Sequence, residues 1–251
     1  MTLDRKLLLI DADTILYKSA FAVEKEVCWG GDTWILFSDL ADAMDVFREE
    51  VSTIRRAFPD DFEFLLCYSS DSNFRKLLLP SYKANRKKTR KPIVFKPLKE
   101  WAFKAYPTLV KPNIEADDIL GICSNEGVMV SIDKDLKTVA GTHYNPNHPE
   151  DGVYEVTEEE AHYNHMTQTL CGDSTDGYKG CPSIGEKTSA KLLDVPVEDM
   201  WGVVKETYKK KGISEKDLIV QARVARILRG NEYNWTCLLY TSDAADDLTR
   251  V

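Results

Sequence analysis

The sequence lacks any long apolar run. Across its 251 residues, no stretch approaches the roughly 20 apolar residues that cross a bilayer. The first residues, MTLDRKLLLIDAD, also lack the long apolar core and the small-residue cleavage site of a secretory signal. These absences exclude a membrane-spanning helix and predict a cytoplasmic protein without a membrane partner.

Cysteine and histidine are scarce. The six cysteines are scattered without a C-x-x-C pair, which argues against a zinc site or a disulfide framework and favours buried, reduced thiols. Among only four histidines, His162 and His165 form an H-x-x-H pair without another soft ligand, so we expect surface histidines on an amphipathic helix. Four tryptophans are expected to pack rather than to stack on bases: Trp29, Trp34, Trp101 and Trp201.

Negative charge prevails overall, with a formal net charge of -8, whereas nucleic-acid-binding proteins usually carry a basic footprint. Residues 72–99, however, hold ten Lys or Arg and no Asp or Glu. A charge run is commonly a solvated face or a loop. Here Tyr82 lies among the cations, a combination that stacks on bases and contacts phosphates in single-stranded channels. The residues predicted to contact DNA from this segment are Arg75, Lys76, Tyr82, Lys87 and Lys88.

Short apolar runs alternate with helical patterns. Residues 6–13, 62–71 and 127–135 read as strands that end in carboxylates, and residues 14–24, 38–58 and 115–123 read as helices. This alternation predicts an α/β fold with a mainly parallel central sheet flanked by helices. From Val156 onward, a capping box of Thr157 and Glu160 and short helices punctuated by Pro and Gly predict an appended helical unit.

Acidic residues recur where the predicted strands end and the helices begin. The carboxyl ends of parallel strands lie along one edge of the sheet, so these acids are expected to converge there. Crowded carboxylates repel one another, and divalent cations remove that penalty. Oxygen ligands without matching His or Cys favour Mg²⁺ or Mn²⁺, and two such ions can support phosphodiester hydrolysis. The predicted metal ligands are Asp11, Asp71, Glu115, Asp117, Asp118, Asp133, Asp135, Asp173 and Asp176.

Each acidic motif has a structural alternative when it is taken alone. A strand-end Asp is often a helix cap or a turn residue. EADDILG can be the acidic first turn of a helix, and SIDKDL can be a strand-to-helix turn. The order and the joint occurrence of the motifs favour a shared site.

Two cations are predicted to act on the scissile phosphate. Lys83 and Arg86 are three residues apart and can share a helical face, where they would stabilise developing negative charge. Further along, GCPSIGEKTSAKLL resembles a helix-hairpin-helix turn whose glycines permit close approach to phosphates. Its alternative is a plain connection between helices. The residues predicted to contact DNA here are Gly180, Ser183, Gly185, Lys187 and Lys191.

The last residues, 237–251, fit neither part. They resemble the read-through translation of a sequencing-library adapter, so we interpret them as a non-native tail that replaces the natural C-terminus. The alternative is a genuine polar tail, and recloning the gene from its source DNA would decide.

In combination, these motifs resemble the flap endonuclease and 5′-3′ exonuclease family, which includes phage exonucleases and the nuclease domain of bacterial DNA polymerase I. The resemblance runs from about residue 7 to 235 and is carried, in order, by LLLIDAD, SSDSNFRK, YKANR, EADDILG, SIDKDL, CGDSTDG and GCPSIGEKTSAKLL. The sequence departs from the family pattern in two places. Ala12 stands where many relatives have Gly, which leaves the role of Asp13 open, and the basic arch is short.

The resemblance implies a PIN-like nuclease core over residues 1–165, with a basic arch at 72–99, and a helix-three-turn-helix DNA-binding region over 166–236. It implies two Mg²⁺ ions, with Mn²⁺ as a possible substitute, and K⁺ held at the hairpin turn. The expected partners of this monomer are DNA 5′ ends, nicks, flaps and RNA primers, in the host cytoplasm if the gene belongs to a phage. The alternatives are a PIN-like single-strand ribonuclease and a DNA-binding module without catalysis.

Overall fold

A six-stranded sheet forms the centre of the protein. The computed structural model describes residues 6–230, 232–234 and 239–240, without the side chains of residues 87, 88, 234, 239 and 240. The strand order is β5-β4-β1-β6-β7-β8, and every neighbouring pair is parallel except β7 and β8. The predicted mainly parallel α/β sheet is therefore confirmed. The strands are β1 (Leu7–Asp11), β4 (Glu63–Tyr68), β5 (Thr108–Val110), β6 (Val128–Val130), β7 (Gly141–Tyr144) and β8 (Val153–Val156).

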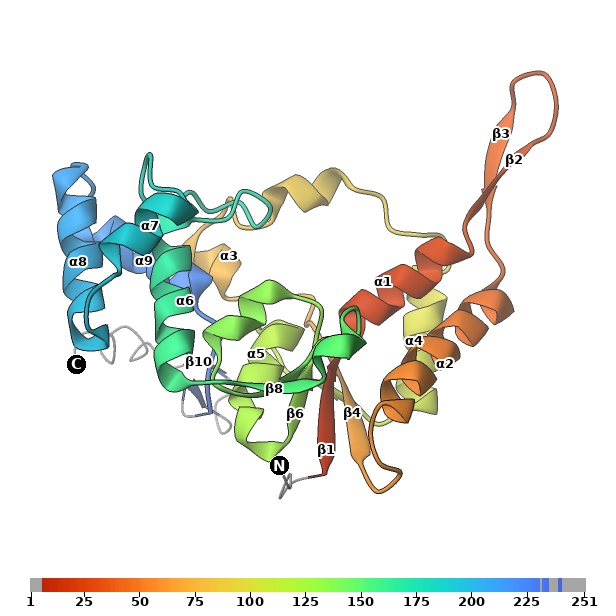
Figure 1. Cartoon of the computed structure of the whole chain (residues 1–251). Helices are drawn as coiled ribbons and strands as arrows, with labels where there is room; N and C mark the ends of the chain where they lie inside the picture. Colours follow the sequence, from red (N-terminus) through yellow and green to blue (C-terminus); the bar gives the residue numbers. More distant parts are fainter. Residues whose placement is uncertain (1–5, 231, 235–238, 241–251) are drawn as a thin grey trace.

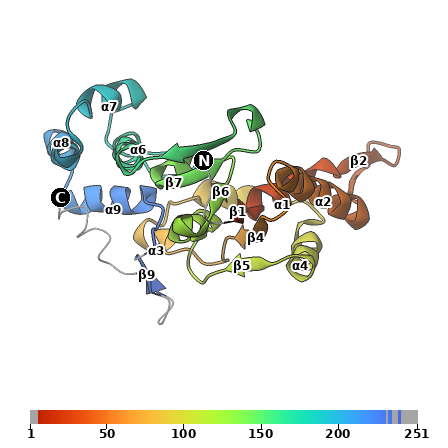
Figure 2. The ribbon, with the colours of Figure 1, turned by 60° about the horizontal axis from the view of Figure 1, so that its bottom comes forward.

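Helices cover both faces of the sheet because its central strand is apolar on both sides. Leu8 and Ile10 belong to one hydrophobic core and Leu9 to another. The first core includes side chains of α1, α2 and α4, which Figures 1 and 2 show together on one side, and the second includes those of α5. These helices are α1 (Ala12–Ala22), α2 (Leu40–Arg56), α4 (Phe95–Ala105) and α5 (Ala116–Ile122).

The C-terminal helices have a core of their own, to which Met166, Val204 and Leu218 contribute. The capping box of Thr157 and Glu160 forms as predicted at the start of α6. The boundary predicted between residues 165 and 166 falls inside α6, so the two predicted units share this helix. The helices are α6 (Glu158–Cys171), α7 (Glu186–Leu192), α8 (Val197–Lys210) and α9 (Glu215–Ala225).

His165 corrects the expectation of surface histidines. It is only 1% exposed, and its Nε2 lies 2.9 Å from the Ala222 carbonyl oxygen, so it joins α6 to α9. His162 is partly buried. The five cysteines within the described residues are free, but only Cys67 and Cys181 are buried as expected, whereas Cys123 and Cys171 are partly buried and Cys28 is exposed.

The basic segment, residues 72–99, crosses from the C-terminal helical region to α4, one of the helices that cover the sheet. Figure 1 shows it running over the top of the molecule, from α3 (Arg75–Leu78) through η1 (Ala84–Lys88) to α4. The predicted arch extended to residue 99, but Phe95 and Leu98 are buried in the sheet core. The last part of the basic run is therefore a packed helix. The remaining short helices are η2 (Ser124–Glu126), η3 (Lys134–Thr138) and η4 (Pro149–Asp151).

A hairpin of β2 (Lys25–Cys28) and β3 (Trp34–Phe37) projects from the body (Figure 1) and was not predicted. Trp29 is 75% exposed and Trp34 is 61% exposed, so the expectation that these two side chains pack is wrong. Trp101 does pack edge-on against Phe47, with ring centroids 5.9 Å apart, and Trp201 is buried.

Within the described ranges, no helix is both long enough and apolar enough to traverse a bilayer. The tail predicted at residues 237–251 lies outside the described residues, apart from the backbone of β10 (Leu239–Tyr240), which pairs with β9 (Tyr233–Asn234).

Candidate active site

The acids at the ends of β1 and β6 are joined through a serine. Asp11 ends β1, and its Oδ1 accepts a hydrogen bond from the Asp13 amide at 3.2 Å. Ser131, just after β6, donates its hydroxyl to Asp11 Oδ2 at 3.3 Å, and the Asp133 amide donates to Ser131 Oγ at 3.1 Å. Two adjacent parallel strands thus bring their acids to the same edge of the sheet, as predicted.

Asp117, in the first turn of α5, shares an electrostatic environment with these acids. Its Oδ1 atom is buried and has no hydrogen-bond partner in the structure. Burial raises the pKa of Asp117 well above its usual value, and the charges of Asp11 and Asp133 raise it further, whereas Lys83 opposes the shift. The charged form of this carboxyl is therefore strongly disfavoured unless a cation approaches.

Burial and repulsion between like charges also raise the pKa values of neighbouring acids. Burial, followed by repulsion from Asp13, raises the pKa of Asp11 to about 7. Burial, followed by repulsion from Asp133, raises the pKa of Asp135 to about 6. In the part of the chain that the structure describes, none of these acids forms an ion pair. We call Asp11, Asp117, Asp133 and Asp135 the uncompensated carboxylates.

Glu115, immediately before α5, has the opposite environment. Lys83 Nζ lies 2.6 Å from Glu115 Oε1, and Tyr82 donates its hydroxyl to Oε2 at 2.7 Å. Burial disfavours the charged carboxylate, but the charges of Lys83 and Arg75 outweigh burial and lower the pKa of Glu115 to about 2. Burial likewise works against charged Lys83, whose pKa Glu115 nevertheless raises.

Asp176 receives both predicted catalytic cations. Arg86 Nη2 donates to Asp176 Oδ1 at 2.6 Å, and Lys83 Nζ lies 3.5 Å from Oδ2. The backbone is fixed as well, because the Lys83 amide donates to the Asp176 carbonyl at 2.7 Å. Lys83 and Arg86 therefore do point to one place. Glu115 and Asp176 form ion pairs with these cations, and we call the two acids the paired carboxylates.

Arg75 and Asp118 form a buried ion pair, with 3% and 0% of each residue exposed. Arg75 donates to both oxygens of Asp118, at 2.7 and 2.6 Å, and the amides of Glu115 and Leu228 also donate to that carboxylate. The structure thus argues against two predicted roles. Arg75 has no surface to offer DNA, and Asp118 already accepts four hydrogen bonds instead of facing a metal ion.

Tyr82 and Asp71 also differ from the predictions. Tyr82 is 3% exposed and packs in a cluster with Tyr178 and Val224, so it is not available to stack on a base. Asp71 is exposed and lines a cavity with Lys91 and Lys99, and none of the buried acids is among the residues that line it. Lys76 is exposed, as a DNA contact requires, whereas the side chains of Lys87 and Lys88 lie outside the described residues.

The hairpin turn divides into a packed part and an open part. Gly180 has a φ of +62°, and a Cβ there would lie 2.3 Å from the Gly172 amide nitrogen. Its own amide donates to Gln221 Oε1 at 2.9 Å, so the protein, not a phosphate, satisfies it. Asp173 Oδ1 accepts two turn amides nearby. Of the residues predicted to contact DNA here, Ser183, Gly185, Lys187 and Lys191 are exposed.

Three contributors were not assigned from the sequence. Ser131 joins Asp11 to Asp133, and Gln221 caps the hairpin turn from α9. Asp13, whose role was left open, accepts the Ser69 amide at 2.9 Å and raises the pKa of Asp11. The S-x-D spacing of Ser131 and Asp133 was the available signal for the serine, since a hydroxyl two residues ahead can meet that amide. No local sequence pattern indicates that Gln221 contacts the hairpin turn.

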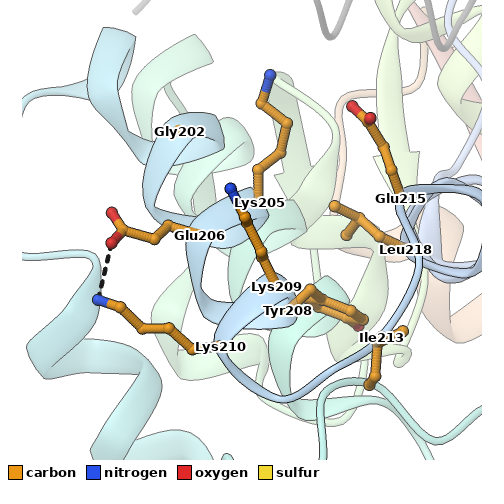
Figure 3. A pocket seen from close by; sticks show the side chains of 9 residues that line it. All are labelled: Gly202, Lys205, Glu206, Tyr208, Lys209, Lys210, Ile213, Glu215 and Leu218. Atoms are coloured by element: carbon orange, nitrogen blue, oxygen red, sulfur yellow. Dashed lines mark ion pairs between the residues drawn. The ribbon is translucent and has the colours of Figure 1, made fainter.

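A cavity of about 690 Å³ lies between α8 and α9. Figure 3 shows the residues that line it, which include Lys205, Lys209 and Ile213. None of its lining residues is among the predicted site residues. We therefore place the candidate site at the strand ends instead.

The uncompensated carboxylates suit a hard divalent cation. Among the described residues, no three Asp, Glu, His or Cys side chains are arranged so that together they could hold a metal ion. Mg²⁺, however, keeps several waters and binds through one or two carboxylates together with substrate phosphates. The unpartnered, buried Asp117 oxygen and the raised pKa of Asp11 are what such an ion would relieve, so the residues fit the group.

Known proteins resemble this chain over nearly all of its length. It is 28% identical to the exodeoxyribonuclease of Enterobacteria phage T3, over 92% of this chain and 90% of that protein. It is also 28% identical to the exonuclease of Escherichia phage T7, over 92% and 91%. The phage T5 D15 protein, crystallised with metal ions, shares the fold with a TM-score of 0.65 at 12% identity, over 98% and 97%.

These similarities agree with the resemblance that the motifs predicted. Residues 6–166, more than half of the chain, match the family described as the 5′-3′ exonuclease N-terminal, resolvase-like domain, and the chain belongs to that family.

Proposed function

We propose that this protein is a metal-dependent, structure-specific nuclease that hydrolyses phosphodiesters at DNA 5′ ends. It acts as a 5′-3′ exonuclease and also removes flaps and RNA primers. The observation that carries the proposal is the set of uncompensated carboxylates beside Lys83 and Arg86, at the carboxyl edge of the sheet. The T3 and T7 relatives, named as an exodeoxyribonuclease and an exonuclease, support this activity.

Asp11, Asp117, Asp133 and Asp135 are the proposed metal-holding residues. Two bound Mg²⁺ ions, or Mn²⁺ in their place, would supply charge that stabilises the attacking and leaving oxygens at phosphorus. Ser131 positions Asp11, and Asp13 adds negative charge beside it. Buried Arg75 and Asp118 hold the start of α5, and with it Asp117, in place.

Lys83 and Arg86 are proposed to bind the scissile phosphate. In the structure their charges are directed at Glu115 and Asp176, so both side chains lie beside the acids before DNA arrives. Arg86 is half exposed and can turn toward a phosphate, whereas Lys83 is largely buried. Cations fixed where negative charge develops are the largest usual contribution to such a reaction.

Duplex DNA is proposed to lie against α7. Lys187 and Lys191 are exposed and four residues apart, so their ammonium groups can contact neighbouring phosphates. Gly185 leaves open space at the start of this helix. Monomeric action, K⁺ at the hairpin turn and a site of action in the host cytoplasm remain parts of the proposal.

The test is a product-length assay on nicked, 5′-flapped and RNA-primed duplexes, labelled at the 5′ end, with Mg²⁺ titrated from zero. We expect short 5′ products that require Mg²⁺ and that Asp117→Asn abolishes. Intact substrates at every Mg²⁺ concentration would refute the nuclease proposal. Cleavage of single-stranded RNA but of no DNA substrate would instead favour the ribonuclease alternative.

A further inference from the structure

A cavity of about 520 Å³ lies next to the acids, on the side of β4, β5 and α4. Its volume falls within the range of about 300–1,000 Å³ that is usual for small-molecule sites. The lining side chains that matter are Ser69, Lys91, Lys96, Lys99 and Phe103. No predicted role accounts for this combination of cations, a hydroxyl and an aromatic ring.

The cations of the cavity have little anionic compensation. The Lys99 ammonium lies 5.5 Å from the ring centre of Tyr68 and 5.4 Å from that of Phe103, and Lys91 lies 4.5 Å from that of Phe95. Neither lysine forms an ion pair within the described residues. Two acids, Asp71 and Glu100, also line the cavity, and only Glu100 approaches a lysine, Lys96, at 4.0 Å.

An anion is therefore the ligand that these cations favour. Lys99 is half-buried and has ring faces as its recorded neighbours, which attract a cation but do not neutralise it. A phosphate in the cavity would add charge-assisted hydrogen bonds to the ammonium groups. Ser69 Oγ accepts the Ala116 amide at 3.0 Å, which leaves its hydroxyl proton available for a phosphate oxygen.

The aromatic wall suits a nucleobase. Phe103 is 39% exposed, so one part of its ring faces open space. Bases stack on such rings without sequence preference, at about 1–3 kcal/mol per base. A phosphate site and a ring in one cavity match one nucleotide better than inorganic phosphate.

The cavity is also connected to the acids. The Ser69 amide donates to Asp13 Oδ2 at 2.9 Å, and the charge of Asp13 raises the pKa of Asp11. Ser69 thus links the cavity wall to Asp13, the neighbour of Asp11, by one hydrogen bond. A strand that is cut at those acids can place its next nucleotide here.

We infer that this cavity binds one nucleotide of the cleaved strand, on the side of the scissile phosphate that leaves, with its phosphate on Lys91 and Lys99 and its base on Phe103. This inference rests on the proposed nuclease function and adds a specific subsite to it. The same chemistry serves a nucleotide within a 5′ flap and a free 5′-mononucleotide after release.

The first arm of the test measures binding of dAMP to the whole protein by titration calorimetry, with deoxyadenosine as the phosphate-free probe. We expect dAMP to bind and Lys99→Met to weaken binding about tenfold or more, as loss of a charged hydrogen bond of about 1.5–3 kcal/mol predicts. Lys104→Met is the matched control, because Lys104 is exposed on α4 and does not line the cavity. Lys91→Met, on a separate segment, replaces Lys99→Met if the latter does not fold.

The second arm measures kcat and KM on a nicked duplex and on the same duplex with a one-nucleotide 5′ flap. A tenfold rise in KM for the flap alone in Lys99→Met would support the inference even if free dAMP does not bind, and would assign the subsite to the strand. Normal cleavage by every cavity variant, with no dAMP binding, would overturn it while the nuclease proposal survives. A wild-type protein that cuts neither duplex would refute the nuclease proposal itself.

Discussion

The two groups of carboxylates at the carboxyl edge of the sheet have the same chemistry and opposite electrostatics. The pKa of Glu115, although burial opposes ionisation, is held at about 2 by Lys83 and Arg75. The pKa of Asp11 is raised to about 7 by burial and by Asp13, with no cation to counter them. Burial acts in the same direction on both, so the nearby cation decides the outcome.

This contrast separates what the chain satisfies internally from what it leaves for a ligand. The paired carboxylates fix the basic segment over the site through Lys83 and Arg86. The uncompensated carboxylates form no ion pair within the described residues, so protons or a cation from solution relieve their mutual repulsion. We infer that the paired carboxylates hold the basic segment in place and that the uncompensated carboxylates bind the metal ions.

The variant Asp117→Asn gives the strongest test of the contrast between the paired and the uncompensated carboxylates. We expect cleavage to fall by about 10²–10³-fold or more, because the variant loses a buried charge that faces a bound cation. In metal-free buffer its stability should equal or exceed that of the wild type, since an amide removes the repulsion from Asp11 and Asp133. Rates come from the 5′-end assay and stability from urea unfolding.

Asp151→Asn is the matched control, because Asp151 is an exposed acid in η4, outside the site. Full activity of Asp117→Asn, or a large loss of its metal-free stability, would remove Asp117 from the uncompensated group.

Arg75→Met tests a pair that we place in the framework. Removing one partner of a buried ion pair costs about 3–5 kcal/mol, because the Asp118 carboxylate is left buried without its cation. The urea midpoint should fall accordingly. Arg86→Met removes a half-exposed partner of Asp176 and should cost under about 1 kcal/mol. Equal losses for the two variants would contradict the assignment of Arg75 to the framework.

Lys83→Met sharpens the comparison at the paired group. We expect kcat to fall about 10²-fold, as is usual when one fixed charge is removed from a reacting phosphate. The pKa of Glu115 should also rise, because Lys83 is the first of the groups that lower it. Lys83→Arg should retain part of the rate. If Lys83→Met kept the wild-type kcat while melting earlier, Lys83 would be structural only.

The sequence predicted the strand-end acids because their positions follow from local pattern and topology. Asp11 and Asp133 follow apolar runs, and parallel pairing of β1 with β6 then brings them together. The roles of Arg75 and Tyr82 could not be predicted in that way. Their partners lie far away in the chain: Asp118 is 43 positions from Arg75, and Asp176 is 94 positions from Tyr82. A lysine-rich stretch predicts exposed side chains, and only the folded structure shows that the Arg75 cation is buried.

The β2–β3 hairpin was missed for a related reason. Hydrophobic periodicity reports which residues face a core, but Trp34 and Phe37 face no core and are largely exposed. Asp71 shows the reverse case, since it ends the β4 run as a ligand should and yet lines the cavity beside Lys99. In each case the spacing gave the position in the chain, while tertiary packing decided the neighbours.

The last expected effect concerns how stability depends on pH. A folded-state pKa of about 7 for Asp11, against a usual 3.8, means that the folded protein binds this proton more tightly than the unfolded chain does. Metal-free stability should therefore fall as pH rises from about 4 to about 7. Glu115 has the opposite sign, because its lowered pKa contributes stability that is lost only as pH falls from its usual 4.5 toward about 2.

Mg²⁺ should thus raise the melting temperature more at pH 7.5 than at pH 5, where Asp11 is protonated and binds a cation poorly. Saturating metal binding is worth about 3 kcal/mol at 100 times its Kd, which corresponds to roughly 5–10 °C in a protein of this size. Differential scanning fluorimetry at the two pH values, with and without 10 mM Mg²⁺, measures the difference, and Asp117→Asn should reduce it. Equal Mg²⁺ shifts at both pH values would mean that the ion does not bind at Asp11. The uncompensated carboxylates would then lose the feature that sets them apart from the paired ones.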